Sequence, residues 1–321
     1  MVCVRGRRGR AHRGRGTNAP APSSADAFNV VFNILNKLVL NAFPYPWLLS
    51  TIQLGAGVIW MGALWGTGLQ KFPKITPAFV KALAPVALFH TIGHVSTCVA
   101  ISSMAVSFTH VVKASEPVFS VVLSSLLMRE SYGIFVWLSL IPIVGGCSLA
   151  AMKEVSFGLG GVSGAMISNV AFVFRNIYSR KGMDNLKDVD GINFYGVISI
   201  FSLLYLAPFA VFFEGSKWAA GWASAMAAGW TVKNLCLLIA ASGIFYHLYN
   251  QSSYMCLDAG IGPVSFSVAN AMKRVVVIVS SVIFFRNFVA PMNWAGTAAA
   301  LAGAYAYTVA KRMDAEKKKA A

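Results

Sequence analysis

Charged residues, and acidic residues above all, are scarce in this chain of 321 residues. Asp, Glu, Lys and Arg together make up 12% of it, about half of what a soluble domain usually has. That is too little charge to cover a water-facing surface, which excludes an ordinary soluble enzyme and a disordered protein. Only 11 residues are acidic against 27 Lys and Arg, so the net charge is +16.

Recognisable catalytic and metal-binding motifs are also lacking. The five cysteines form no CxxC pair and no Cys/His spacing of a zinc site. There is no GxSxG string, no P-loop and no pair of carboxylates within an apolar stretch. We therefore expect no disulfide, no metal, no cofactor and no enzymatic activity.

Long apolar stretches dominate what is present, since 57% of the residues are hydrophobic. A membrane-spanning helix needs about 20 mostly apolar residues. We expect an all-α polytopic membrane protein with ten transmembrane helices, near residues 27–43, 47–69, 82–105, 107–128, 132–151, 157–179, 192–213, 231–256, 261–285 and 290–310.

Basic residues outside these stretches are unevenly distributed. Leaving out the N-terminal arm, twelve Lys and Arg fall on the side that both chain ends share, and four fall on the other: Lys153, Lys217, Lys233 and Arg286. The positive-inside rule then places both ends in the compartment from which the protein inserts. Basic charge concentrated in the tails of an apolar chain argues against nucleic acid as a partner.

The two ends differ from the apolar body. Residues 1–26 are rich in Arg, Gly, Pro and Ser, and Asp26 is their first acid. That composition is typical of an organelle transit peptide, and a disordered basic arm that is retained is the alternative. We expect residues 311–321 to form a basic, solvated C-terminal tail.

Short strings recur in the same order in the two halves of the chain. The matches pair residues 29–32 with 169–172, 106–109 with 264–267, and 124–125 with 280–281. We infer a five-helix repeat over 27–155 that returns, inverted, over 156–310. Inverted repeats with a site near the midplane are typical of secondary transporters.

Five basic residues lie within the expected spans, and each costs about 2.5–3.5 kcal/mol at a helix centre. Lys37 and Arg175 stand near span ends, so we expect them to reach the lipid headgroups. The other three, Lys113, Lys273 and Arg274, lie deeper, at near-equivalent positions of the two halves.

These three deeper cations are expected to meet in one cavity. Glu116, one helical turn from Lys113, is the acid expected to pair with it. The positive charge that remains suits a phosphate dianion, which Arg binds in a bidentate manner. A charge network that only holds helices together is the alternative.

Polar residues in two spans are candidates for contact with the rest of such a ligand. His90 and His94 share a helix face, but no acid accompanies them as a metal site would require. His94 or Thr97 is placed to hydrogen-bond a sugar or carboxylate. Residues 245–254 are also unusually polar for a span, so they face protein or a cavity.

Specific strings resemble those of the plastid phosphate translocators, a family of the drug/metabolite transporter superfamily. They are VLNAFPYPW (39–47), HTIGH (90–94), AVSFTHVVK (105–113), FYHLYNQ (245–251) and the pair Lys273-Arg274. The resemblance runs from about residue 28 to 312 and is strongest to the glucose-6-phosphate/phosphate branch, for example at WAAGW (218–222).

This resemblance implies a multi-pass protein of the plastid inner envelope that exchanges inorganic phosphate for a phosphorylated C3, C5 or C6 compound. Glucose 6-phosphate is the expected sugar phosphate. Triose phosphate/3-phosphoglycerate or a pentose phosphate is the alternative, and a nucleotide-sugar transporter is a more distant one. The implied phosphate-binding residues are Lys113, Lys273 and Arg274, and the implied contacts of the organic moiety are His94, Thr97 and Tyr249.

Overall fold

Helices account for nearly all of the computed structural model, which describes residues 22–152, 154–185, 189–258 and 263–320 and has no strand among them. The expected transit peptide falls largely outside the described residues, because residues 1–21 are not among them. Its last residues, 22–26, belong to the first helix.

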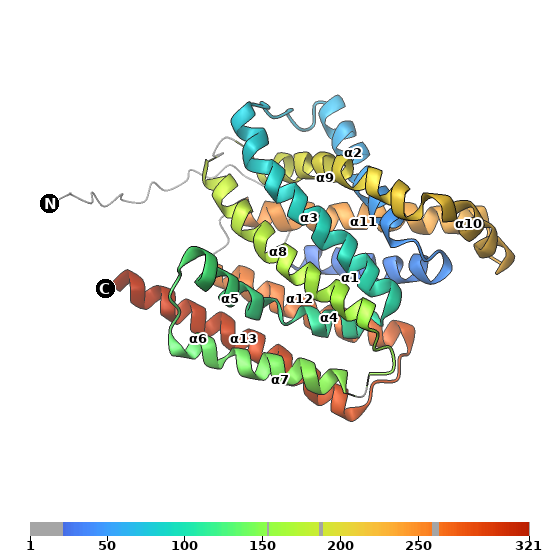
Figure 1. Cartoon of the computed structure of the whole chain (residues 1–321). Coiled ribbons are helices and arrows are strands. Elements are labelled where there is room, and N and C mark those ends of the chain that lie inside the picture. Colours follow the sequence, from blue (N-terminus) through green and yellow to red (C-terminus); the bar gives the residue numbers. More distant parts are fainter. Residues whose placement is uncertain (1–21, 153, 186–188, 259–262, 321) are drawn as a thin grey trace.

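The described residues of the first half of the chain form seven helices (Figure 1). Three of them begin with proline, which is well suited to a first helical turn because it has no N–H to satisfy there. Thr76 also caps the third, since its hydroxyl accepts a hydrogen bond from the backbone N–H of Phe79 at 3.2 Å. The helices are α1 (Pro22–Ala42), α2 (Pro46–Gly66), α3 (Pro77–Ser103), α4 (Val106–Lys113), α5 (Glu116–Met128), α6 (Ile134–Leu138) and α7 (Leu140–Ala151).

The residues described in the second half add six α-helices and one turn of 3₁₀-helix. Asp190 begins the second of them, because its carboxylate accepts from the backbone N–H of Asn193 at 2.8 Å. The elements are α8 (Leu159–Asn185), α9 (Gly191–Glu214), η1 (Gly215–Lys217), α10 (Trp218–Ala227), α11 (Val232–Asp258), α12 (Pro263–Phe285) and α13 (Pro291–Ala320).

The C-terminal tail, expected to be merely solvated, continues the last helix. Helix α13 runs without a break from Pro291 to Ala320. Its Asp314 carboxylate accepts from the backbone N–H of Gly133 at 3.2 Å. The C-terminal part of α13 is therefore hydrogen-bonded to the connection between α5 and α6.

Each of the ten expected spans coincides with one helix or with two consecutive helices. By length and hydropathy, six stretches of the described chain can cross a membrane. The helices outside this set carry Asn, Lys or Arg within their apolar stretch, so their crossing remains a prediction. The six are Pro46–Gly66, Pro77–Ser103, Val106–Leu127, Ile134–Ala151, Gly191–Ala227 and Val232–Met255.

The fourth and fifth expected spans are each divided in two, which was not predicted. The fourth breaks after Lys113, between α4 and α5. Pro117 explains this break, because proline has no N–H to donate to the carbonyl four residues earlier, which is that of Lys113. The fifth breaks at Ser139.

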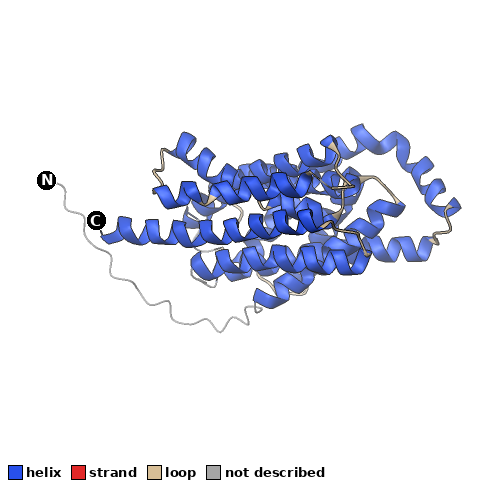
Figure 2. Ribbon diagram, turned by 90° about the horizontal axis from the view of Figure 1, so that it is seen from below, coloured by secondary structure: helices blue, strands red, loops and turns tan. Residues whose placement is uncertain are grey.

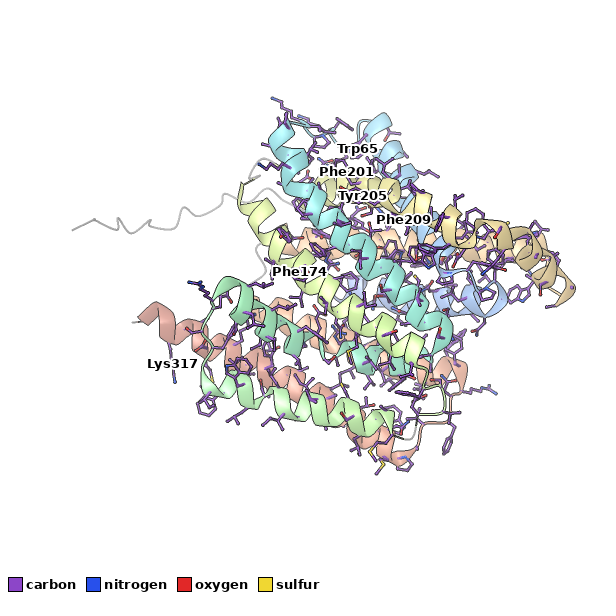
Figure 3. The ribbon with its side chains drawn as sticks, in the orientation of Figure 1. Trp65, Phe174, Phe201, Tyr205, Phe209 and Lys317 are labelled. Carbon is purple, nitrogen blue, oxygen red and sulfur yellow. The ribbon has the colours of Figure 1, made fainter. Side chains whose placement is uncertain are left out.

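The helices run alongside one another and form an elongated bundle (Figures 1 and 2). The α2–α3 and α5–α6 connections lie at the same end as the C-terminus, and α10 lies at the opposite end. Trp65 and the α9 residues Phe201, Tyr205 and Phe209 line one side of the bundle (Figure 3). Phe209 is 56% exposed, as a lipid-facing side chain would be.

Helix pairs that are distant in the sequence make the main contacts. Helix α3 packs along α8, and α1 packs along α11. Helix α2 contacts α9, and α7 contacts α13. Helix α4 lies against α12, so Lys113 and the pair Lys273-Arg274 stand on neighbouring helices.

Candidate functional site

Lys113 occupies the end of α4, at the break that Pro117 imposes. Every residue of α4 is buried, and Lys113 itself is only 7% exposed. Its Nζ atom donates to the hydroxyls of Ser168 at 2.5 Å and Thr97 at 3.1 Å. The ammonium also lies 4.6 Å from the centre of the Phe172 ring, as a cation–π contact requires.

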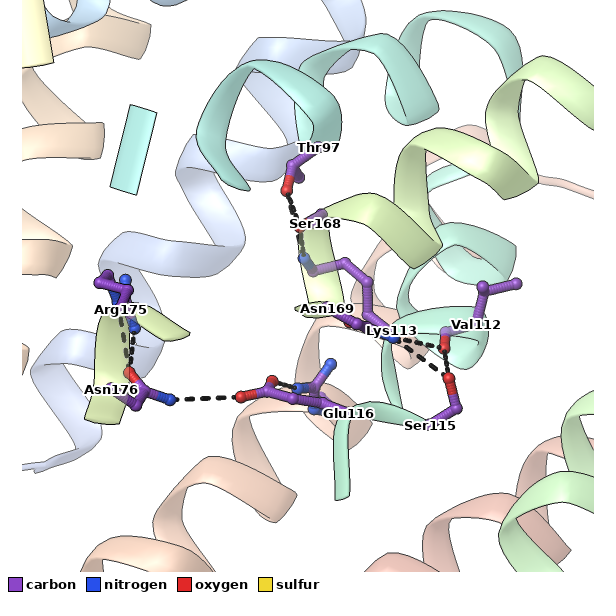
Figure 4. Close-up of polar contacts among 10 residues, drawn as sticks. Thr97, Val112, Lys113, Ser115, Glu116, Ser168, Asn169, Arg175 and Asn176 are labelled. Atoms are coloured by element: carbon purple, nitrogen blue, oxygen red, sulfur yellow. Dashed lines mark hydrogen bonds and ion pairs between the residues drawn. The ribbon is translucent and has the colours of Figure 1, made fainter. Parts of the chain in front are cut away.

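Hydroxyls, not a carboxylate, hold this buried cation (Figure 4). Thr97 comes from α3 and Ser168 from α8, and their Oγ atoms are 2.8 Å apart. Thr97 also donates to the carbonyl of Gly93 at 2.8 Å. Within the described ranges no carboxylate lies at ion-pair distance from Lys113. The arrangement fixes the ammonium without neutralising it.

Glu116 pairs with Arg274, and the expected pair with Lys113 is wrong. The Arg274 Nη2 atom lies 2.5 Å from Glu116 Oε2. The break between α4 and α5 explains the difference, because it removes the one-turn helical spacing that the prediction assumed. The ion pair therefore joins α5 of the first half to α12 of the second.

Arg175 belongs to the same cluster, although we expected it to reach the headgroups. Its Nε and Nη2 atoms donate to Asn176 Oδ1 at 3.2 and 2.9 Å. Asn176 Nδ2 in turn donates to Glu116 Oε1 at 3.4 Å, so a chain of polar contacts leads to the ion pair (Figure 4). Arg175 lies 4.5 Å from the centre of the Phe172 ring.

Lys37, which we expect from the sequence to reach the headgroups, binds backbone carbonyls of the protein. Its Nζ atom donates to the carbonyls of Ile101 at 2.8 Å and Met104 at 2.9 Å. These carbonyls lie at the end of α3, where helical acceptors have no intrahelical donor. Lys37 therefore caps a helix and lies outside the cation cluster.

Lys273 lies against an aromatic ring. Its Nζ atom is 4.6 Å from the centre of the Tyr249 ring. Asp26 interacts with it electrostatically, although no ion-pair contact to Lys273 occurs in the described part of the chain. Tyr249 packs on Phe32, with ring centroids 5.3 Å apart. The structure thus brings Tyr249 and Lys273 together, as predicted residues of one site.

His94 is connected to Tyr249 through a third ring. The His94 ring stacks on Tyr246 with centroids 4.0 Å apart, and Tyr246 lies 5.6 Å from Tyr249. The Nε2 atom of His90 is already hydrogen-bonded within the protein, since it lies 2.8 Å from the Tyr246 hydroxyl. The buried Nε2 of His94 has no hydrogen-bond partner among the described residues.

The structure therefore gathers the six predicted residues in one region, on α3, α4, α11 and α12. Helix α8 contributes further residues that sequence reasoning missed as site members. They share one face of α8, at the spacing i, i+4, i+7 and i+8. That spacing was a usable signal, and the residues are Ser168, Phe172, Arg175 and Asn176.

Comparison with known proteins identifies the group to which this architecture belongs. Residues 27–308 match the Triose-phosphate Transporter family. The xylulose 5-phosphate/phosphate translocator of Arabidopsis thaliana is 58% identical over 291 residues, which are 91% of this chain and 69% of that protein. Glucose-6-phosphate/phosphate translocator 1 of the same plant is 52% identical, over 89% of this chain and 73% of that protein.

More distant relatives and a solved structure are similar to this chain over a comparable length. The triose phosphate/phosphate translocator of Flaveria trinervia is 41% identical, over 91% of this chain and 71% of that protein. A solved crystal structure shares the fold at a TM-score of 0.54, with 16% sequence identity, over 91% of this chain and 98% of that chain. On the family match over most of its length and on these identities, the chain belongs to the Triose-phosphate Transporter family.

Proposed function

We propose that this protein is an antiporter that exchanges inorganic phosphate for a sugar phosphate. The observation that supports this most is the buried ammonium of Lys113, which donates to two hydroxyls and has no ion-pair carboxylate among the described residues. It also interacts electrostatically with the cations of Arg274 and Lys273. An unneutralised cation in a membrane-embedded site is costly unless an anion joins it. A phosphate dianion supplies that charge and accepts the hydrogen bonds that Lys and Arg donate.

Transport by alternating access follows from the origin of the cations. Lys113 belongs to the first half of the chain, and Lys273 and Arg274 belong to the second. A phosphate bound to all three draws the two halves together. Release on the other side then requires only that the halves part at the opposite end of the site.

We further propose ten membrane crossings arranged as two inverted five-helix repeats. The pattern of helix contacts supports the repeat. Exchanging the halves converts the α3–α8 pair into the α11–α1 pair, and the α2–α11 pair into the α9–α3 pair. The α2–α9 and α7–α13 pairs are converted into themselves. This is the contact pattern expected of two related units around a central site.

The sugar is proposed to lie toward His94, Thr97 and Tyr249, of which Thr97 and Tyr249 adjoin the phosphate-binding lysines. A pentose phosphate is our first candidate, because the chain is more similar to the xylulose 5-phosphate translocator (58%) than to the glucose-6-phosphate translocator (52%). Glucose 6-phosphate, expected from the sequence, is the second candidate. Triose phosphate is the third, since that translocator is 41% identical.

The proposed location is the plastid inner envelope, because the relatives named above are chloroplastic proteins. Residues 1–26 are proposed to be a transit peptide that directs the chain there. The basic residues at the C-terminal end of the bundle are proposed to face the compartment of insertion. Among them are Lys71 and Lys74 in the α2–α3 connection and Lys81 near the start of α3.

The test is counter-exchange in liposomes that contain the purified protein and internal phosphate. We expect labelled phosphate to enter these liposomes. External xylulose 5-phosphate, glucose 6-phosphate and triose phosphate are then each tested, first as competitors of that uptake and then as substrates. We expect xylulose 5-phosphate to compete best and a nucleotide sugar not to compete. If no sugar phosphate exchanges with phosphate while a nucleotide sugar is transported, the proposed function is wrong.

A further inference from the structure

Glu116 lies among the cations of the proposed phosphate site, where an acid should weaken phosphate binding. One of its carboxylate oxygens is 2.5 Å from Arg274, and the other accepts from Asn176 at 3.4 Å. The side chains of Arg274 and Glu116 are only 19% and 22% exposed. Electrostatic interaction with Glu116 also reaches Lys113 and Lys273.

A carboxylate and a phosphate compete for a guanidinium. Both accept parallel hydrogen bonds from the same edge of the planar group, so Glu116 and a phosphate cannot both occupy the Nη2 edge of Arg274. Glu116 directly follows the break after α4 and lies three residues from Lys113. Any phosphate that reaches Lys113 and Arg274 together meets this carboxylate.

The charges of the cluster define which anion neutralises it. Four cations interact there electrostatically: Lys113, Arg175, Lys273 and Arg274. Among the described residues, Glu116 and Asp26 are the carboxylates that act on these cations, and Asp26 belongs to the proposed transit peptide. Glu116 therefore lowers the positive charge of the cluster by one, whether or not Asp26 is present. Without Glu116 the cluster is one charge more positive, so a trianion fits it better relative to a dianion.

We propose that Glu116 is a built-in competitor of the substrate, which holds Arg274 when no phosphate is bound and favours dianions over trianions. The proposal rests on the proposed function. This competition explains how a site with four cations releases its phosphate, since the Glu116 carboxylate returns to Arg274 as the phosphate leaves. Glu116 thereby sets both the affinity for phosphate and the charge of the preferred substrate.

The test is Glu116→Gln, which keeps the shape and hydrogen bonds of the side chain but removes its charge. Phosphate/phosphate exchange in liposomes gives KM and kcat. We expect KM to fall about tenfold, because a charge-assisted hydrogen bond exceeds a neutral one by about that factor, and kcat to fall because release is slower. At pH 8, uptake of the trianion 3-phosphoglycerate should rise relative to a dianionic sugar phosphate.

The matched control is Glu130→Gln. This exposed carboxylate accepts a hydrogen bond from the Tyr132 hydroxyl and lies outside the cation cluster. Its KM should equal that of the unchanged protein. Should Glu116→Gln fail to insert, Glu116→Asp decides, since a shorter carboxylate competes less and KM should fall by a smaller factor. An unchanged or raised KM in whichever variant is measured would overturn the proposal. Failure of the unchanged protein to exchange phosphate would instead refute the proposed function.

Discussion

Three cations at the site should each be essential for exchange. Replacing Lys113, Lys273 or Arg274 with Ala removes a donor from a buried anion, which costs about 2–5 kcal/mol of binding. We therefore expect at least a 30-fold loss of phosphate exchange in each variant, measured in liposomes at matched protein content. Near-normal exchange in any two of the three would show that the phosphate does not bind there.

Lys37→Ala is the control for those variants, because Lys37 is also a cation within an expected span. It donates to two backbone carbonyls at the end of α3 and lies outside the cluster. We expect a lower melting temperature in detergent and an unchanged KM for phosphate. A shift of KM as large as that of the site variants would mean that any intramembrane cation affects binding.

Thr97 should influence selectivity. Its hydroxyl accepts a hydrogen bond from Lys113 and contacts the hydroxyl of Ser168. The resemblance to the phosphate translocators implies that Thr97 contacts the organic part of the substrate. We expect Thr97→Ala to change the ratio of triose phosphate to hexose phosphate uptake more than phosphate self-exchange. Because a single hydrogen bond contributes about 0.5–1.5 kcal/mol, the change should be about two- to tenfold. Thr97→Ser should restore the original ratio, whereas equal loss for all substrates would make Thr97 a packing residue.

The meeting of single residues was predictable where two independent signals marked them in the sequence. Lys113, Lys273 and Arg274 combined charge inside an apolar stretch with near-equivalent positions in a repeat. Arg175 gave only the first signal and was assigned to the headgroups. Its place depends on packing between α5, α8 and α12, which the shared face of α8 does not define by itself. The pairing of Glu116 failed for a related reason, because it assumed an unbroken helix.

Close contact between α7 and α13 should depend on glycine. A Cβ atom on Gly146 would lie 2.4 Å from the backbone N of Ala300, and one on Gly296 would lie 2.4 Å from the backbone N of Ala150. Small residues allow such close approach of helices in membranes. We expect Gly146→Ala to force the helices apart and lower stability by about 1–3 kcal/mol, seen as a lower melting temperature in detergent.

Gly145→Ala provides the comparison, because a Cβ atom there meets nothing within 4 Å. The variant should match or exceed the stability of the unchanged protein, since alanine favours a helix over glycine by up to about 1 kcal/mol. Both variants should keep the KM for phosphate, because none of the described site residues lies on α7 or α13. Equal melting temperatures of the two variants would contradict the packing argument.

Helices were predictable from the sequence because each needs a long apolar stretch, and helices cover most of the described residues in each of the ten expected ranges. The divisions within two of them were harder to see. Pro117 did signal the break after Lys113, but the apolar run continues across it. The helix formers in residues 311–320 did indicate a helix. Its contact with the rest of the protein, from Asp314 to Gly133, is tertiary and could not be expected from composition.

At the scale of the whole molecule, the charge of the site accounts for the proposed exchange. An empty, closed site holds unneutralised positive charge in the described cluster, which costs several kcal/mol. A bound dianion offsets that charge and links α4 of one half to α12 of the other. The empty protein should therefore change sides rarely, and the loaded protein should do so readily. One-for-one exchange follows without any further energy source.

Uptake of labelled phosphate into liposomes with and without internal phosphate tests this account most directly. Several kcal/mol correspond to a hundredfold or larger difference in the population of the closed state. We therefore expect uptake into preloaded liposomes to exceed uptake into empty ones by at least about tenfold, after correction for protein orientation. Equal rates would show that the empty protein changes sides freely and would contradict the account.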